Sequence, residues 1–225
     1  MSAPPATTNA TPSYIRSHVP LQALCRHYRL QATPVDPSGI VGDCHDMAIA
    51  EDVRTYYPPT HVLAVTQVDM PSVPLMIPIN ANMFQTGFRY ELTLPPSAAT
   101  PVPRIVDTNT DPVISLPVVP VVVPHPSSLS LILLYGLGLE TDTHPLSLAL
   151  LPGSVVGEFP NAAAMATVLA SIPRDSFDRI YRHNQGIWKN VLALGMRNQR
   201  IVELVSIVWN VTAEARRIRN RTRQQ

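Results

Sequence analysis

The sequence predicts an α+β fold in which short strands and helices are followed by an all-helical C-terminal third. Three observations lead to this prediction. A valine-rich run is followed directly by an apolar stretch with helical spacing. The 24 prolines all lie before residue 174, and their frequency is about twice the usual ~5%. The segment from Asn198 to Arg219 carries the longest helical repeat of apolar residues.

The valine run and the apolar stretch after it form the centre of the predicted fold. Valine is β-branched and favours a strand. Because proline cannot donate to a sheet ladder, Pro117, Pro120 and Pro124 predict a strand at the edge of a sheet. Pro126 suits the first turn of a helix, and the residues after it have the spacing of a buried helix. We therefore expect a strand, a structural corner at Pro124, His125 and Pro126, and a core helix.

Several shorter elements are expected before this centre. Residues 1–14 lack periodicity and are predicted to be disordered. A short helix is expected from Tyr14 to Leu30, and one or two helical turns within Met47–Tyr57. Alternating β-branched residues predict strands at His61–Val68 and Val73–Ile79.

The elements after the centre are all helical. Short helices are expected at Pro145–Leu151 and at Ala162–Ile172, the second with Asn161 as its N-cap. Beyond Pro173 the sequence predicts a helix through Arg182 and another at 186–194 that ends at Gly195. The last helix runs from residue 198 to 219, with the apolar stripe Ile201, Leu204, Val205, Val208, Trp209, Thr212 and Ala215.

Composition and charge divide the chain near residue 173. Residues 15–173 are predicted to form a proline-rich α+β core, and residues 174–225 a helical region with a basic tail. Residues 1–173 carry 6 basic and 12 acidic side chains, whereas residues 174–225 carry 11 basic and 4 acidic ones. This asymmetry indicates that the two ends of the protein have different partners.

The sequence contains few residues that could carry chemistry. Asp43-Cys44-His45-Asp46 is the most reactive cluster, but it lacks the additional ligands of a zinc site and is expected to be an ordinary loop. His125 is expected to be a hydrogen-bonded structural residue. Phosphate loops and hydrolase signatures are missing from the sequence. We therefore expect no catalytic residue, metal or cofactor, although a role for Cys44 and His45 stays open.

Five arginines lie close together near the C-terminus: Arg216, Arg217, Arg219, Arg221 and Arg223. They are interpreted either as a solvated helix end that complements the helix dipole, or as a signal for nuclear targeting or nucleic-acid contact. On the preceding turns, Leu204, Val205, Val208 and Trp209 are the predicted partner-binding residues, because an amphipathic helix can dock in a groove.

The compartment and membrane relationship follow from simple counts. Two cysteines indicate a reducing compartment, and the N-terminus lacks the apolar core of a secretory signal. Apolar runs are too short to cross a bilayer. We expect an intracellular protein of the nucleus or cytoplasm that has no membrane segment.

One stretch resembles a known family. Residues 123–135, VPHPSSLSLILLY, are similar to a segment of BTB/POZ domains, especially fungal ones, and HVLAVTQVDMPSVPLMIPINANMF is similar to the hairpin of that fold. The helices with NAAAMA, IWKNVLALG and WNVTAEARRIR resemble the tail of clampless-type basidiomycete proteins. The resemblance implies a BTB/POZ-like core and a non-enzymatic regulator of clamp-cell formation, dikaryon growth and sexual development. Its implied partners are proteins such as transcription factors in the nucleus, and a homodimer stays open.

Three other functions remain as alternatives. The arginine cluster is compatible with a nucleic-acid-associated protein, which would bind with a steep salt dependence. Many prolines, low charge and a basic end are also compatible with a viral or structural shell protein. An enzyme is the last alternative, because the spacing of reactive residues does not support one.

Overall fold

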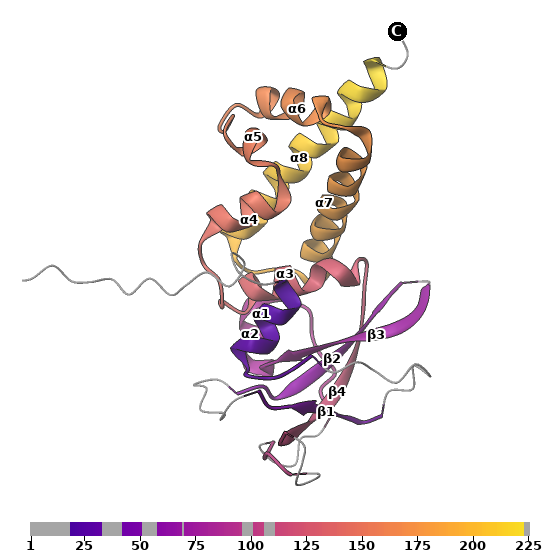
Figure 1. Cartoon of the computed structure of the whole chain (residues 1–225), viewed down its shortest axis with the longest axis vertical. Helices are drawn as coiled ribbons and strands as arrows, with labels where there is room; N and C mark the ends of the chain where they lie inside the picture. The colour runs from indigo at the N-terminus through magenta and orange to yellow at the C-terminus, as the bar shows by residue number, and fades with distance from the viewer. Residues whose placement is uncertain are drawn as a thin grey trace, which may run out of the picture.

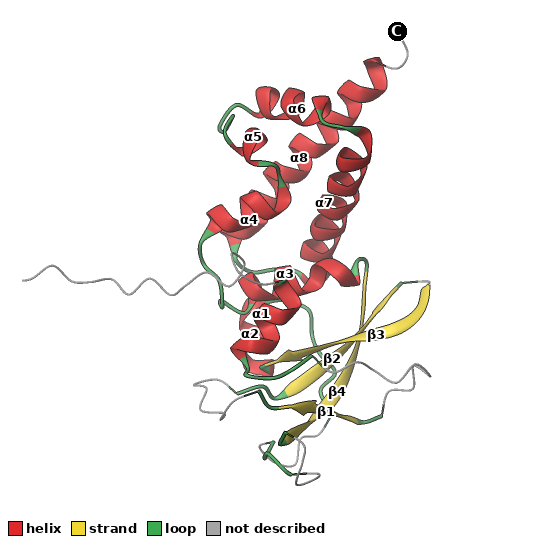
Figure 2. Cartoon of the chain, viewed as in Figure 1, coloured by secondary structure: helices red, strands yellow, loops and turns green. Residues whose placement is uncertain are grey.

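The computed structural model describes residues 19–32, 42–50, 58–68, 70–95, 101–105 and 111–222. These residues form a four-stranded sheet and eight helices, which confirms the α+β prediction (Figure 1). The sheet lies at one end of the molecule, and the longest helices project from the other end (Figure 2). The predicted disordered segment 1–14 lies outside the described residues.

The strands are β1 (Cys44–Ala48), β2 (His61–Gln67), β3 (Met70–Ile79) and β4 (Val113–Val123). Their order across the sheet is β1-β4-β2-β3. Strand β4 is antiparallel to β1 and parallel to β2, and β2 and β3 form an antiparallel hairpin. The strands predicted at 61–68 and 73–79 are therefore confirmed, with β3 starting three residues earlier.

The helices are α1 (Pro20–His27), α2 (Ala81–Gly87), α3 (Pro126–Gly136), α4 (Thr143–Leu150), α5 (Gly153–Val156), α6 (Ala162–Ser171), α7 (Arg174–Leu194) and α8 (Gln199–Thr222). Helices α1, α2 and α3 lie between the sheet and the helices that project from it (Figure 1). The buried cluster around α3 contains side chains from before and after residue 173, so α7 and α8 share a core with the earlier elements.

The prediction that the valine strand lies at the edge of a sheet is wrong, because β4 lies between β1 and β2. The two halves of β4 nevertheless have different partner strands: Val113–Pro117 pair with β1, and Val118–Val123 pair with β2. The N–H group of Val118 donates to the carbonyl of Asp43 at 2.9 Å, so even-numbered residues direct their N–H toward the β1 side. Proline at 120 therefore removes a donor where β1 has already ended.

Pro117 also lies where the sheet needs no donor, but on the side of β4 that faces β2. An N–H at this odd-numbered position would point toward β2, but the pairing with β2 begins only at Val118.

On the other edge, Pro78 of β3 lies opposite Val62 in a pair that cannot be hydrogen-bonded through proline. The same alternation directs Pro78 and Pro74 to the outer side of β3. The outer edge of β3 is therefore poor in donors, which does not favour the addition of a partner strand there.

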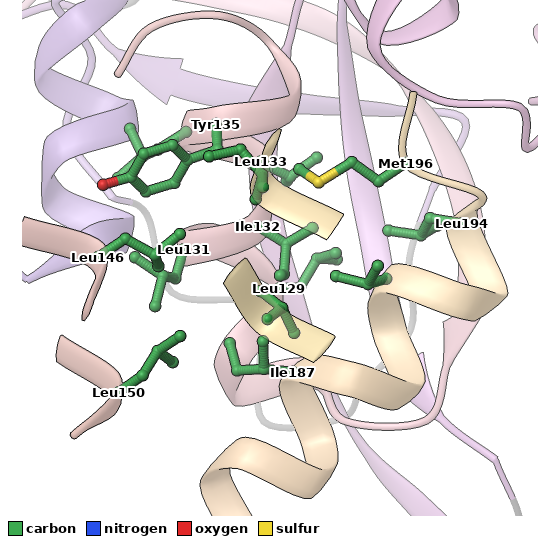
Figure 3. Packing of buried hydrophobic residues seen from close by; sticks show 14 of the residues in the cluster. Leu129, Leu131, Ile132, Leu133, Tyr135, Leu146, Leu150, Ile187, Leu194 and Met196 are labelled. Atoms are coloured by element: carbon green, nitrogen blue, oxygen red, sulfur yellow. The ribbon is translucent and has the colours of Figure 1, made fainter. Parts of the chain in front are cut away.

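Helix α3 is the centre of the core, as predicted. Every side chain from Ser128 to Tyr135 is buried, because the helix is covered on all sides. Figure 3 shows Leu131, Leu146 and Ile187, which come from three different helices, in the cluster around it.

Helices α2 and α3 cross at two glycines. A Cβ atom on Gly87 would lie 1.8 Å from the carbonyl oxygen of Gly136. A Cβ on Gly136 would lie 2.0 Å from the ring of Phe88. Only glycine allows this close approach of the two helices.

A smaller apolar cluster fills the opposite side of the sheet. Tyr28 from the end of α1 is fully buried there, and its hydroxyl accepts a hydrogen bond from the N–H of Asn80 at 3.1 Å. Burial raises the pKa of Tyr28 to about 12. The other buried members are Cys25, Leu30, Met47, Ile49, Val62, Ala64, Met76, Ile114, Leu116 and Val118.

Helix α7 is continuous, whereas the sequence predicted a break before Gly186. The structure places Gly186 against the corner residue His125, where an added Cβ would lie 2.3 Å from the imidazole Cγ. The glycine therefore serves close packing rather than a helix end. The predicted C-cap is confirmed, since Gly195 follows α7 in the left-handed conformation at φ 60°.

Three local predictions need correction. Strand β1 replaces the loop expected at Cys44 and the helical turns expected from Met47, and residues 51–57 lie outside the described part. Helix α1 is shorter than expected and begins at Pro20. Helix α5 was not predicted. By contrast, the cap at Asn161 is confirmed, because its side chain accepts a hydrogen bond from the N–H of Ala164.

Candidate interaction groove

A charged hollow of about 330 Å³ lies between the first half of α7 and the last turns of α8. We call it the arginine groove. Its lining consists of Arg174, Phe177, Asp178, Tyr181, Arg182, Arg216, Arg219 and Asn220. Among the described residues, four arginines and a single acidic residue therefore line one hollow. The start of α7 and the end of α8, which form it, lie at the end of the helical region that is distant from the sheet (Figure 1).

Aromatic rings form the floor of the arginine groove and stack against two of its arginines. The Tyr181 ring centroid lies 5.4 Å from that of Trp209 and 6.2 Å from that of Phe177. The guanidinium carbon of Arg216 lies 4.2 Å above the Tyr181 ring, and that of Arg219 lies 4.7 Å above the Phe177 ring. Both distances are within the range of cation–π attraction.

Arg219 has a structural role besides this stacking. Its Nη1 donates to the carbonyl oxygens of Ala170 and Ile172, both at 2.7 Å. These carbonyls belong to the C-terminal end of α6, where backbone acceptors lack partners within the helix. Arg219 therefore attaches α8 to the end of α6, and this guanidinium is largely engaged within the protein.

The other arginines of the predicted basic tail have different environments. Arg217 forms an exposed ion pair with Glu214 at 2.9 Å, and Arg221 is exposed on the last turn of α8. Arg223 lies outside the described residues. Of the four described arginines of this tail, only Arg216 and Arg219 line the arginine groove.

Arg174 and Arg182 extend the positive charge along α7. The Nε atom of Arg174 lies 3.7 Å from a carboxylate oxygen of Asp178. The Nε atom of Arg182 donates to the backbone carbonyl of Asp178 at 3.2 Å. These two arginines were not among the predicted site residues, although residues 174, 178 and 182 have the i, i+4, i+8 spacing that places side chains on one helix face.

The predicted partner-binding stripe needs correction. Val205 is 1% exposed and Val208 is 3% exposed, so both belong to the intramolecular core. Leu204 is partly buried and packs against the same core, and Trp209 is partly buried beside the ring of Tyr181. Val205 and Val208 therefore belong to the inner face of α8, whereas Leu204 and Trp209 keep part of their surface exposed.

A polar cluster fixes the predicted structural corner to α7. The side chain of Asn190 contacts both backbone groups of His125 and the hydroxyl of Ser128, the last at 3.0 Å. The Nδ1 atom of His125 lies 2.9 Å from the same hydroxyl oxygen. Burial, and then the positive charge of Lys189, lowers the pKa of His125. Pro124 and Pro126 flank this cluster.

The pair Cys44 and His45 lies on strand β1. Successive side chains of a strand point to opposite faces, so the two do not converge on one site. Burial lowers the pKa of His45, while the nearby Asp46 acts in the opposite direction. Within the described ranges, His, Cys, Asp and Glu side chains do not gather in a group that could hold a metal ion.

Comparisons with protein-family models, curated proteins and solved structures find no match for this chain. The resemblance to BTB/POZ and clampless-type proteins therefore stays a prediction. Among the described residues, none of the helices is both long enough and apolar enough to cross a membrane.

Proposed function

We propose that this protein is a non-enzymatic interaction regulator that binds a protein partner through the arginine groove. One observation carries the proposal: cationic side chains of α7 and α8 converge on an open hollow whose floor is aromatic. Arginine, tyrosine and tryptophan are the residues that contribute most to protein–protein binding, because they combine apolar area with directed polar groups.

The sheet supplies an argument by elimination. Strand addition requires a row of backbone donors and acceptors along an open edge. Pro74 and Pro78 remove donors from the outer edge of β3, and Pro120 removes one from the part of β4 that does not pair with β1. The arginine groove is therefore a better docking surface than these parts of the sheet.

The biological setting of the proposal comes from the family resemblance alone. In that setting the partner is a nuclear protein such as a transcription factor, and the process is clamp-cell formation in fungal sexual development. A mainly acidic partner segment fits the groove, because four of the charged side chains that line it are positive and one is negative.

The experiment that tests the proposal is affinity purification of the tagged full-length chain from its own cells, with and without nuclease. The groove variant is Arg182→Gln with Arg216→Gln. The matched control is Arg200→Gln with Arg221→Gln, which removes the same charge from exposed positions of α8 that do not line the groove.

We expect specific protein partners that survive nuclease and bind the control variant, but are lost with the groove variant. Equal recovery with both variants would contradict a role for the groove. Recovery that depends on nucleic acid, and that weakens equally in both variants, would instead favour non-specific phosphate binding by the whole basic end.

A further inference from the structure

The arginine groove carries more positive charge than one carboxylate can neutralise. Arg174, Arg182, Arg216 and Arg219 line it, and Asp178 is its single acidic residue. Asp178 lies near Arg174 at 3.7 Å, and Arg219 is engaged with carbonyls of α6. Arg182 and Arg216 are left as the main cations without an acidic neighbour within ion-pair distance among the described residues.

The stacked geometry of Arg216 leaves its donors available. A ring occupies one face of its guanidinium plane, at 4.2 Å from the Tyr181 centroid. The N–H groups of a guanidinium lie in its plane, so the stacking does not use them. A guanidinium held in this way loses little conformational freedom when its edge binds an anion, and its planar fork matches the oxygens of a phosphate.

The N-terminal end of α7 adds to the positive potential of the arginine groove. Arg174 is the first residue of this 21-residue helix, and Pro173 at its N-cap provides no side-chain cap. The first N–H groups of a helix lack acceptors within it and form the positive end of its dipole. This end lies at the groove, because Arg174 and Phe177 both line the hollow.

The distribution of charge favours one compact anionic group over a long polyanion. Arg217, outside the hollow, is paired with Glu214. Arg179 does not line the hollow, and its Nη2 lies 3.5 Å from the hydroxyl of Ser176 on the same helix. A nucleic-acid strand needs a continuous basic path along its backbone, often with exposed stacking rings. Here the rings of Tyr181 and Phe177 are covered by guanidinium groups.

From these observations we infer that the arginine groove is a recognition site for a phosphorylated side chain of the protein partner. This inference rests on the proposed function and names the group that is recognised. Edge N–H groups of Arg182 and Arg216 bind the phosphate oxygens, and Arg174 completes the positive rim. The hollow of about 330 Å³ also accommodates the residues that flank the phosphorylated side chain. Partner binding is then switched on by phosphorylation of the partner.

The test uses the full-length chain, labelled with ¹⁵N, and four probes. These are N-acetyl-O-phosphoserine methylamide, N-acetylglutamate methylamide, inorganic phosphate and a single-stranded oligonucleotide. Binding is followed by NMR through the backbone signals of α7 and α8 and the arginine Nε–H signals. Arg182→Gln and Arg216→Gln are the groove variants, Arg216→Lys tests the planar fork, and Arg221→Gln is the matched control.

We expect saturable shifts with phosphoserine that are centred on Tyr181 and the arginines of the groove. Each groove variant weakens this binding by about tenfold, since each removes a charge-assisted contact. Arg216→Lys weakens it as well, whereas Arg221→Gln changes it by less than about twofold. Glutamate binds at least about tenfold more weakly than phosphoserine, because it offers one negative charge fewer. Inorganic phosphate bound as tightly as phosphoserine would overturn the inference of a peptide-borne group.

The inference is also overturned if phosphoserine causes no saturable shift, if Arg221→Gln weakens binding as much as Arg216→Gln, or if the oligonucleotide alone saturates the site. Partner capture separates this failure from failure of the proposed function. Partners that depend on the groove but still bind after phosphatase treatment would leave the proposed function standing and remove the phosphate. Phosphoserine binding without any groove-dependent partner would leave the phosphate site standing and remove the proposed function.

Discussion

Asn190 of α7 holds the backbone of His125 from both sides. Its Oδ1 accepts from the His125 N–H at 3.1 Å, and its Nδ2 donates to the His125 carbonyl at 2.7 Å. The side-chain amide of Asn190 therefore forms hydrogen bonds with the backbone of the corner between β4 and α3. Because Asn190 is fully buried, the two helices and the sheet are joined at this point without solvent.

Removal of this amide should destabilise the whole fold. Asn190→Ala leaves the N–H of His125 without its acceptor and removes one of the donors to the His125 carbonyl, so we expect a loss of about 1–3 kcal/mol in the free energy of unfolding. Urea denaturation followed by circular dichroism measures it. Leu192→Ala on the exposed side of α7 is the control and should cost less than about 0.5 kcal/mol. Equal effects would contradict the role assigned to Asn190.

Stability should decrease at mildly acidic pH because of two partly buried histidines, His125 and His183, in the same region. Burial and the neighbouring His125 lower the pKa of His183, whose ring centroid lies 6.4 Å from that of His125. A folded-state pKa below the ordinary value of 6.5 favours the neutral ring in the native state. The unfolded chain then binds more protons as pH falls below 6.5, so stability is fully present above this pH and is lost below it.

The measurement is the urea midpoint between about pH 7.5 and pH 5.5, a range in which carboxylates stay mostly ionised. We expect the midpoint to decrease toward pH 5.5 and His183→Gln to reduce the decrease. His144→Gln, which replaces an exposed histidine of α4, is the matched control. A midpoint that rises toward acid pH would show that the sign is wrong.

The two neighbouring arginines Arg219 and Arg221 should differ strongly in their effect on stability. Arg219→Ala removes two hydrogen bonds to carbonyls of α6 and the contact with Phe177, so about 1–3 kcal/mol should be lost. Arg221→Ala should change stability by less than about 0.5 kcal/mol, because the residue is exposed. Thermal denaturation of the two variants decides this, and equal melting temperatures would refute the attachment of α8 to α6.

The two cysteines should react at different rates. Burial raises the pKa of the Cys25 thiol to about 11, whereas Cys44 is exposed on β1. Since the thiolate is the reactive form, Ellman's reagent at about pH 8 should label one thiol rapidly and the second only on unfolding. Cys44→Ser should abolish the rapid phase. Rapid reaction of two thiols in the native protein would contradict the burial of Cys25.

Local signals in the sequence were sufficient to predict the centre of the fold. The valine run with Pro126 after it predicted β4 and α3, and the caps Asn161 and Gly195 marked the ends of α6 and α7 correctly. These features depend on backbone dihedral preferences and on side chains within a few residues, so the sequence contains the information directly.

Features that depend on distant residues were not predictable in this way. Strand β1 forms because β4 pairs with it, and the polar run at Cys44 gave no sign of a strand. Gly186 was read as a helix break because its real neighbour, His125, lies on another element. Burial of Val205 and Val208 and the position of Arg219 against α6 likewise depend on tertiary packing. The arginine groove joins two helices, so periodicity on either one alone did not reveal it.

The prolines within β4 also bear on the life of the chain before it folds. Five valines in six residues make a segment with low charge and high β-propensity, the composition from which amyloid fibrils grow. Fibril growth requires each added strand to offer an unbroken row of amide donors, and Pro117, Pro120 and Pro124 interrupt that row at short intervals. A newly synthesised chain can thus expose its future core strand, before α3 and α7 cover it, with little risk of templated aggregation.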